Sequence, residues 1–251
     1  ENGKRNINQK IKKIILIAVV KLYFYNNYTK MISQNLQNVR AYLPQNVTLV
    51  AVSKTKPVEA ILEAYQAQQR VFGENKAQEM KEKYDALPKD IEWHFIGHLQ
   101  KNKIKYILPF VALIHSVDSL DLLEEINAKA QKINRVVPIL LQVHIAQEEH
   151  KFGFKLNEIF EIIPDFLKYP NIQIKGLMGM GTFTEDQTQL GKEFKSLQDL
   201  FDKIKQSYNK ILPTFDTLSM GMSNDYALAI QNGSNMVRIG STIFGERNYK
   251  K

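Results

Sequence analysis

The sequence contains no cysteine among its 251 residues. Disulfide bonds, thiolate metal ligands and cysteine nucleophiles are therefore excluded, and the composition fits a reducing compartment. Long hydrophobic runs are also missing near the N-terminus, where the apolar run at 14–20 (IILIAVV) ends at Lys21. A membrane-spanning helix needs about 20 apolar residues. We therefore expect a cytoplasmic protein that does not span a membrane.

A strong excess of one charge is lacking from most of the chain. The net charge is +8, but residues 1–30 hold seven basic side chains and one acidic side chain, which leaves 27 basic and 25 acidic side chains for residues 31–251. This nearly balanced body has no concentrated basic stripe, so we expect no binding of nucleic acid. The five histidines are not accompanied by an HExxH motif or an acidic cluster, so we expect no metal site.

Residues 1–30 are expected to be an N-terminal extension outside the fold. Lys12 and Lys13 followed by the apolar run resemble the first two regions of a signal peptide, but no small-residue cleavage site follows. Met31 instead begins an amphipathic helical pattern through Leu43. We interpret Met31 as the natural start of translation. A membrane-surface helix or an export signal is the alternative.

From residue 47 onward, short β-branched runs alternate with helical periods. The predicted strands are Val47–Val52, Val71–Gly73, Glu92–Ile96, Leu113–Ser116, Pro138–Ile145, Ile172–Met178, Thr217–Ser219 and Met236–Ile239. The predicted helices are Val58–Gln69, Ala77–Leu87, Lys101–Leu108, Leu120–Lys132, Leu156–Leu167, Gln187–Tyr208 and Asp225–Gln231. This alternation predicts an α/β protein with a single (β/α)8 TIM barrel over residues 31–251. The Met31–Leu43 helix is an extra N-terminal helix before the first strand.

Lys54 lies where the first predicted strand ends and its helix begins. Pro57 then occupies the first turn of that helix, where the missing N–H of proline costs nothing. Barrels place their chemistry at this end of the strands. Partial burial there lowers the pKa of a lysine amine below its usual value of about 10.4, which makes the amine nucleophilic toward a carbonyl. An ordinary surface lysine is the alternative.

Polar residues also follow four other predicted strands at their carboxyl ends. These segments are Gly73–Asn75, Gly97–Gln100, Ser219–Ser223 and Arg238–Ser241. The last two indicate a phosphate site, because glycine-rich loops after the final two strands of a barrel let backbone N–H groups approach an anion. An amine, such a loop pair and an arginine together suit a ligand with an aldehyde and a phosphate, as in pyridoxal 5′-phosphate. An aldolase that forms a Schiff base with a sugar phosphate would use the same groups.

Seven segments then carry a resemblance to a known family. They are LVAVSKTKP (49–57), RVFGEN (70–75), WHFIGHLQKNK (93–103), IHSVDS (114–119), KGLMGMG (175–181), LSMGMSND (218–225) and MVRIGSTIFGER (236–247). In these segments, from about Asn35 to Arg247, the chain resembles the pyridoxal phosphate homeostasis protein family. The resemblance implies the barrel of fold-type III enzymes such as alanine racemase.

The resemblance also implies roles for particular residues. Lys54 would hold the cofactor as an internal aldimine, Asn75 would line it, and Arg238 would face the pyridine nitrogen. The implied phosphate cradle consists of Met222, Ser223, Gly240 and Ser241. Permanent positive charge at the ring nitrogen disfavours its protonation and weakens the cofactor as an electron sink.

The function implied by the resemblance is intracellular homeostasis of pyridoxal phosphate without robust catalysis, and the implied partners are apo-enzymes that use this cofactor. Fold-type III racemases supply a second base from a C-terminal domain, whereas this sequence ends at Lys251. We therefore expect a monomer with no catalytic residue. The alternative is a pyridoxal-phosphate racemase or lyase acting on small amino acids.

Three further residues have local interpretations. Lys56 reads as a solvated loop lysine, although it would also lower the pKa of the Lys54 amine by charge repulsion or hold cofactor during transfer. His98 is expected to line the pocket or to serve a structural role. Trp93, the single tryptophan, is expected in the core.

Overall fold

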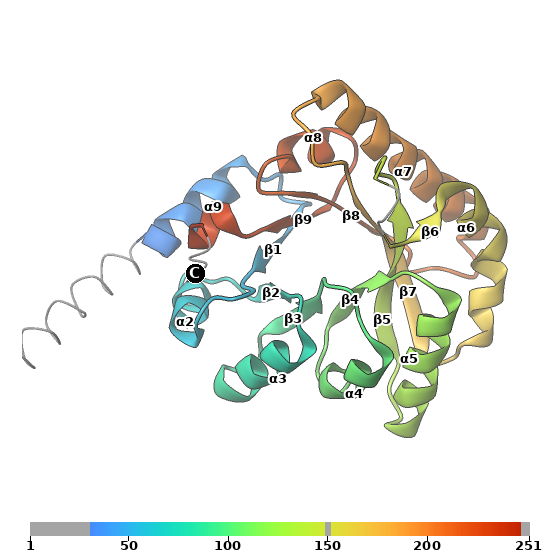
Figure 1. Ribbon diagram of the computed structural model, residues 1–251, viewed down its shortest axis with the longest axis horizontal. Helices are drawn as coiled ribbons and strands as arrows, with labels where there is room; N and C mark the ends of the chain where they lie inside the picture. Colours follow the sequence, from blue (N-terminus) through green and yellow to red (C-terminus); the bar gives the residue numbers. More distant parts are fainter. Residues whose placement is uncertain (1–30, 149–151, 247–251) are drawn as a thin grey trace, which may run out of the picture.

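The computed structural model describes residues 31–148 and 152–246. The predicted extension at 1–30 lies outside the described residues. Within them, eight parallel strands close into a barrel in the order β4-β3-β2-β1-β9-β8-β7-β5, and β5 pairs with β4 to complete the ring (Figure 1). The predicted (β/α)8 barrel is therefore confirmed.

The barrel strands match the predicted runs to within a few residues. They are β1 (Thr48–Val52), β2 (Val71–Glu74), β3 (Glu92–Phe95), β4 (Leu113–Val117), β5 (Val137–His144), β7 (Ile172–Met180), β8 (Thr217–Met222) and β9 (Met236–Ile239). A short additional strand that was not predicted, β6 (Phe154–Lys155), pairs with the end of β5.

Helices surround the barrel (Figure 1). They are α2 (Val58–Gln66), α3 (Ala77–Ala86), α4 (Ile104–Ile107), α5 (Leu120–Lys132), α6 (Leu156–Ile162), α7 (Gln187–Tyr208), α8 (Tyr226–Gln231) and α9 (Ser241–Phe244). Helices α2 to α8 follow the predicted order, whereas the short α9 was not predicted. Residues 31–42 are also helical, as expected of the extra N-terminal helix. No helix in the described part of the chain is long and apolar enough to cross a membrane.

Two of these helices have the predicted bounds because strong caps define their starts. The Ser119 hydroxyl accepts a hydrogen bond from the backbone N–H of Leu122 at the start of α5. The Asp186 carboxylate accepts the backbone N–H groups of Thr188 and Gln189 at the start of α7. Each cap satisfies N–H groups that have no partner inside the helix.

The prediction for the seventh barrel strand was wrong at its end. It placed the end of the strand at Ser219, whereas β8 continues to Met222 through an irregularity in its pairing with β9. Gly221 makes this path possible, because its φ is +91° and a Cβ there would approach the Tyr226 backbone to 2.8 Å. Glycine has low strand propensity, so the predicted strand ended before Gly221.

The core has two layers. Most of it lies between the sheet and the helices and includes Trp93, which is fully buried as expected. A smaller cluster inside the barrel consists of Val50, Leu113, Leu140, Met178 and Met236. Because successive strand residues point to opposite faces, the next inward position along several strands lies nearer the carboxyl-terminal mouth. Polar side chains occupy some of these positions.

Candidate functional site

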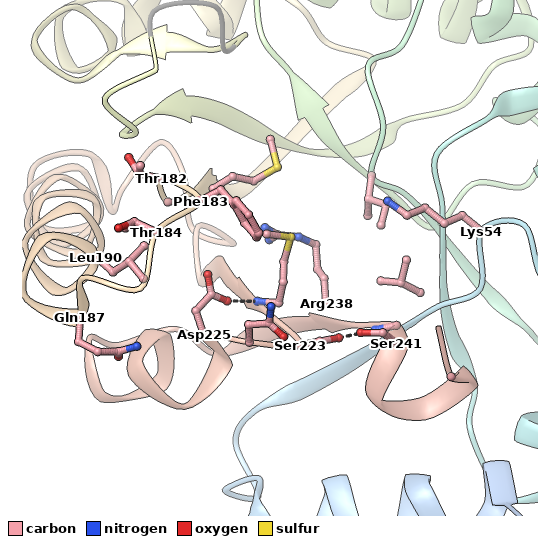
Figure 2. Close-up of a pocket in the computed structure, with 18 of the residues that line it drawn as sticks. Lys54, Thr182, Phe183, Thr184, Gln187, Leu190, Ser223, Asp225, Arg238 and Ser241 are labelled. Atoms are coloured by element: carbon pink, nitrogen blue, oxygen red, sulfur yellow. Dashed lines mark hydrogen bonds between the residues drawn. The ribbon is translucent and has the colours of Figure 1, made fainter. Parts of the chain in front are cut away.

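A cavity of about 450 Å³ opens at the carboxyl-terminal mouth of the barrel. The structure brings six of the seven predicted cofactor residues to its lining: Lys54, Met222, Ser223, Arg238, Gly240 and Ser241. In Figure 2 the Lys54 side chain extends into the cavity from one wall, and Ser223 and Ser241 lie together on another. The groups that sequence analysis collected at separate strand ends therefore share one space.

A strained turn directs Lys54 toward this cavity. Thr55 has a φ of +66°, a left-handed conformation that non-glycine residues seldom adopt. The residues on both sides of Lys54 are held by carboxylates: the Ser53 hydroxyl donates to Glu74 Oε1 at 2.6 Å, and the Thr55 backbone N–H donates to Glu79 Oε1 at 2.6 Å. These two bonds fix the backbone around Lys54 in the conformation that the turn requires.

The ammonium of Lys83 completes this arrangement. Its Nζ lies 2.7 Å from Glu74 Oε1, 2.7 Å from Glu79 Oε1 and 2.9 Å from the Ser53 carbonyl oxygen. Burial raises the pKa of Glu74 to about 7, while the charge of Lys83 and its hydrogen bond act in the opposite direction. We call Ser53, Glu74, Glu79 and Lys83 the Lys83 clamp. Glu74 was predicted at the mouth, but it belongs to this clamp, on the α3 side of β2.

Lys56 connects the Lys54 turn to the segment at the end of α9. Its Nζ donates to the backbone carbonyl oxygens of Phe244, Gly245 and Glu246 at 2.8, 3.0 and 3.1 Å. The reading of Lys56 as a solvated loop lysine is therefore wrong. Its Nζ instead binds three carbonyl oxygens at the end of α9 and just beyond it, which no sequence pattern indicates.

The two predicted phosphate loops contact each other. The backbone N–H of Gly240 donates to the Ser223 hydroxyl at 3.2 Å, and a Cβ on Gly240 would lie only 3.1 Å from the Val52 carbonyl oxygen. Glycine therefore permits this close approach of backbones. The α9 turn begins at Ser241, so its first backbone N–H groups have no partner within the helix. Hydroxyl and backbone donors suit a phosphate at this place.

One donor of the first loop is already in use. The Asp225 carboxylate accepts the backbone N–H of Met222 at 2.5 Å. The helix after this loop was predicted to begin at Asp225, and α8 begins one residue later, at Tyr226, and has only six residues. The anion-binding capacity of this loop therefore rests on hydroxyl and backbone donors rather than on a helix dipole.

Arg238 is a buried cation that borders the cavity. Its Nη1 donates to the Ser219 carbonyl oxygen at 2.9 Å and to Ser219 Oγ at 2.6 Å, and its Nη2 donates to the Gly179 carbonyl oxygen at 3.0 Å. Burial lowers the pKa of Arg238 to about 10, which leaves it charged at neutral pH. These bonds use three of the five N–H groups of the guanidinium. Among the described residues no carboxylate forms an ion pair with it, and its side chain enters the cavity (Figure 2).

Asn75 is the one predicted cofactor residue outside the cavity lining. It follows β2, and its Oδ1 is buried without a hydrogen-bond partner among the described residues. The adjacent chain is tightly packed, since a Cβ on Gly97 would lie 2.4 Å from the Asn75 carbonyl oxygen. A buried amide oxygen without a partner costs free energy, so a ligand donor there would be stabilising. Its role in the site stays a prediction.

Other expected site residues lie elsewhere. Ser219 is buried within β8, where it accepts the bond from Arg238. His98 does not line the cavity; its Nδ1 lies 3.1 Å from Asp118 Oδ2 and its ring stacks on Phe152. Within residues 31–148 and 152–246 no group of three or more potential metal ligands exists.

One wall of the cavity was not predicted from the sequence. Thr182, Phe183, Thr184 and Gln187 line it between the end of β7 and the start of α7, on the side away from Lys54 (Figure 2). Phe183 is 88% exposed, which is unusual for a phenylalanine. The segment directly follows the KGLMGMG run (175–181), and Gly181 also lines the cavity, but the predicted sixth strand ended at Met178 and no site residue was assigned in the loop that follows it.

Comparison with known proteins gives a consistent assignment. Residues 29–248 match the family described as alanine racemase, N-terminal domain. The chain is 43% identical over 202 residues to a pyridoxal phosphate homeostasis protein of Aquifex aeolicus, covering 80% of this chain and 87% of that protein. The solved structure of PipY of Synechococcus elongatus with pyridoxal phosphate bound is 33% identical, with a TM-score of 0.76, and the match covers 85% of this chain and all of PipY.

A more distant likeness concerns the fold alone. An alanine racemase structure of Clostridium difficile has a TM-score of 0.71 at 17% identity, and this chain covers 57% of its length. The barrel is therefore common to both proteins, while the level of identity carries no argument about activity.

Proposed function

The chain belongs to the pyridoxal phosphate homeostasis protein family, and we propose that it binds pyridoxal 5′-phosphate at the barrel mouth and holds it for delivery. A single observation carries the proposal. The Lys54 amine, the Arg238 guanidinium and the hydroxyls of Ser223 and Ser241 all line one cavity of about 450 Å³. A ligand that offers a carbonyl, a ring acceptor and an anion matches these three groups.

The described residues fit this cofactor. When bound, pyridoxal phosphate supplies an aldehyde that condenses with a primary amine, and a phosphate that accepts several hydrogen bonds. Lys54 is the amine in the lining whose backbone is held on both sides by the Lys83 clamp. Met222, Ser223, Gly240 and Ser241 would hold the phosphate. Arg238 offers its two remaining N–H groups to a ring acceptor.

We further propose that the protein is a carrier rather than an enzyme. The titratable side chains in the described lining are Lys54, Lys56, Asp225 and Arg238, and no tyrosine or histidine is among them. Proton transfer to and from an amino-acid carbon on two faces needs a second positioned base. Asp225 already accepts the backbone N–H of Met222. A permanently charged Arg238 at the ring would also weaken the cofactor as an electron sink.

We propose that the partners of this carrier are apo-enzymes that receive the cofactor. We also propose that the carrier acts as a monomer in the cytoplasm. The cavity is formed by β1, β7, β8 and β9 of one chain. No second copy is required to complete it. Sedimentation of the loaded protein at several concentrations would test this, and a dimer at the lowest concentration would contradict it.

The first experiment is an absorbance titration of the full chain with pyridoxal phosphate. We expect a visible band that saturates at one cofactor per chain and is fixed by borohydride to the peptide that contains Lys54. Lys54→Ala should lose the band. Lys132→Ala is the matched control, because Lys132 is exposed on α5 and should bind like the unchanged protein. A band that persists in Lys54→Ala would refute the assignment.

A second experiment separates carrier from enzyme. The loaded protein is incubated with alanine in deuterated water, and exchange of the α-proton is followed by NMR beside free cofactor. We expect no exchange above the free cofactor, together with transfer of cofactor to an apo-transaminase. Exchange that is faster than with free cofactor and that vanishes in Lys54→Ala would favour the racemase alternative.

A further inference from the structure

A chain of hydrogen bonds runs from the cavity into the barrel interior. Arg238 Nη1 lies 2.6 Å from Ser219 Oγ, Ser219 Oγ lies 3.2 Å from His115 Nδ1, and His115 Nε2 lies 2.9 Å from His94 Nδ1. The four side chains come from β9, β8, β4 and β3. All four are buried. We call them the histidine relay.

In the histidine relay each hydrogen bond is donated in the same sense, from Arg238 toward His94. Arginine donates and never accepts, so Ser219 Oγ accepts from Arg238 and has one proton of its own to donate. If that proton goes to His115 Nδ1, then the proton of His115 is on Nε2 and goes to His94 Nδ1. In the reverse arrangement His115 would donate to Ser219, and the serine proton would have no acceptor among the bonds found in the described residues. The first arrangement gives every proton between Arg238 and His94 Nδ1 an acceptor, whereas the reverse leaves the serine proton without one.

The relay is also electrically neutral beyond Arg238. Burial lowers the pKa of His94 to about 3 and lowers the pKa of His115 well below its ordinary value, and the charge of Arg238 acts on His115 in the same direction. The relay therefore holds the guanidinium in place without neutralising it. A carboxylate at the position of Ser219 would have cancelled the charge.

From this geometry we propose that His115 and His94 are positioning residues for ligand selection. Through Ser219 they fix Arg238 so that its remaining donors face the cavity as an immobile cation. Such a cation accepts a pyridine ring whose nitrogen is an uncharged acceptor and rejects one whose nitrogen carries positive charge. The inference rests on the proposed binding of pyridoxal phosphate and adds the basis of its selectivity.

The test compares two ligands, pyridoxal 5′-phosphate and its N-methyl pyridinium derivative, whose ring is a fixed cation. We expect the full chain to prefer the uncharged ring by about tenfold or more, because two like charges lie close together in a buried site. Ser219→Ala and His115→Phe should reduce this ratio of dissociation constants toward one. His115→Asn should keep most of it, because the amide oxygen replaces Nδ1 as the acceptor for Ser219. A variant that only weakens the fold would weaken both ligands and leave the ratio unchanged.

The outcomes separate the two proposals. If neither ligand binds the unchanged protein, the proposed function fails and the relay inference fails with it. If pyridoxal phosphate binds but the ratio is the same in all variants, only the relay inference is refuted. If His115→Phe does not fold, Ser219→Ala decides, because it removes one oxygen and leaves the bond from Arg238 to the backbone of residue 219.

A second measurement needs no ligand. Nitrogen-15 NMR of the histidine rings at neutral pH should show both His94 and His115 uncharged, with the proton on Nε2 in each, and His115 should change in Ser219→Ala. A charged ring, or a proton on Nδ1 of His115, would overturn the direction of the relay.

Discussion

The Lys83 clamp and the histidine relay support opposite sides of the same cavity in different ways. The clamp is built from charges: one ammonium lies between two carboxylates behind β2. It holds the backbone on both sides of Lys54, at the Ser53 carbonyl oxygen and the Thr55 N–H. In the relay, three neutral side chains inside the barrel, Ser219, His115 and His94, hold the side chain of Arg238 itself. The two networks thus differ in what they hold: the backbone beside the amine in one case, and the side chain of the cation in the other.

The strongest test of this contrast is Lys83→Met. The change leaves Glu74 and Glu79 without their cation, and Glu74 is fully buried. Removing one partner of a buried ion pair costs about 3–5 kcal/mol of unfolding free energy, which urea denaturation measures. Lys81→Met is the matched control on α3, because Lys81 pairs with Asp85 at the surface and should lose at most about 0.5 kcal/mol. Equal losses in both variants would show that the clamp is no stronger than a surface pair.

The charge of Glu74 gives a prediction for pH. Its pKa in the folded protein is raised to about 7 from 4.5, so the folded state binds more protons than the unfolded state between these values. The unfolding free energy should therefore fall as pH rises through this window, by no more than about 3 kcal/mol from this group. Glu74→Gln should flatten the fall, measured by denaturation at several pH values. Part of the slope should persist, because burial also raises the pKa of Glu63 to about 7. A slope unaffected by Glu74→Gln would mean that Lys83 keeps this carboxylate ionised throughout.

Arg238→Met should cost less stability than Lys83→Met. No carboxylate in the described part of the chain forms an ion pair with Arg238, so the change leaves unpaired acceptors on Ser219 and Gly179 but no buried charge. The expected loss is about 1–3 kcal/mol by denaturation. Selection against the N-methyl ligand should disappear at the same time. A loss of stability as large as that of Lys83→Met would break the distinction between the charged and the neutral network.

The smallest expected effect is that of Lys56→Ala. It removes the donor to three carbonyl oxygens at the end of α9 and just beyond it, and because the side chain is only partly buried we expect a loss of about 1 kcal/mol. Cofactor transfer measured in parallel tests whether Lys56 also handles the ligand. An unchanged transfer rate would limit Lys56 to holding the α9 end against the Lys54 turn.

Much of the barrel was predictable because its signals are local. The alternation of β-branched runs and helical periods predicted all eight barrel strands, and α5 and α7 have the predicted bounds because Ser119 and Asp186 cap them. The end of β8 and the short strand β6 were not predicted. A bulge and a two-residue strand depend on the neighbouring chain rather than on their own composition.

Part of the candidate site was likewise predictable from the sequence, and part was not. Lys54, Arg238 and the Gly240–Ser241 loop were predictable because strand ends in a parallel barrel meet at one mouth. The wall at 182–187 was not predicted, because the loop between β7 and α7 reaches the cavity only through the closure of the barrel. Asn75 illustrates the remaining gap: resemblance assigned it to the cofactor, whereas the structure shows a buried amide oxygen outside the lining.

The amino-acid pattern alone was therefore enough for the barrel and for the gathering of an amine, a cation and two glycine-containing loops at its mouth, because periodicity and glycine placement act over a few residues. Only the closed tertiary structure decided which buried polar groups meet. Ser219 and His115 are 104 positions apart in the chain, and Glu74 joins Lys83 behind β2 rather than the cavity. Whether a strand side chain points into the barrel or out of it depends on strand register and on closure of the barrel. Both are set by packing across the whole sheet.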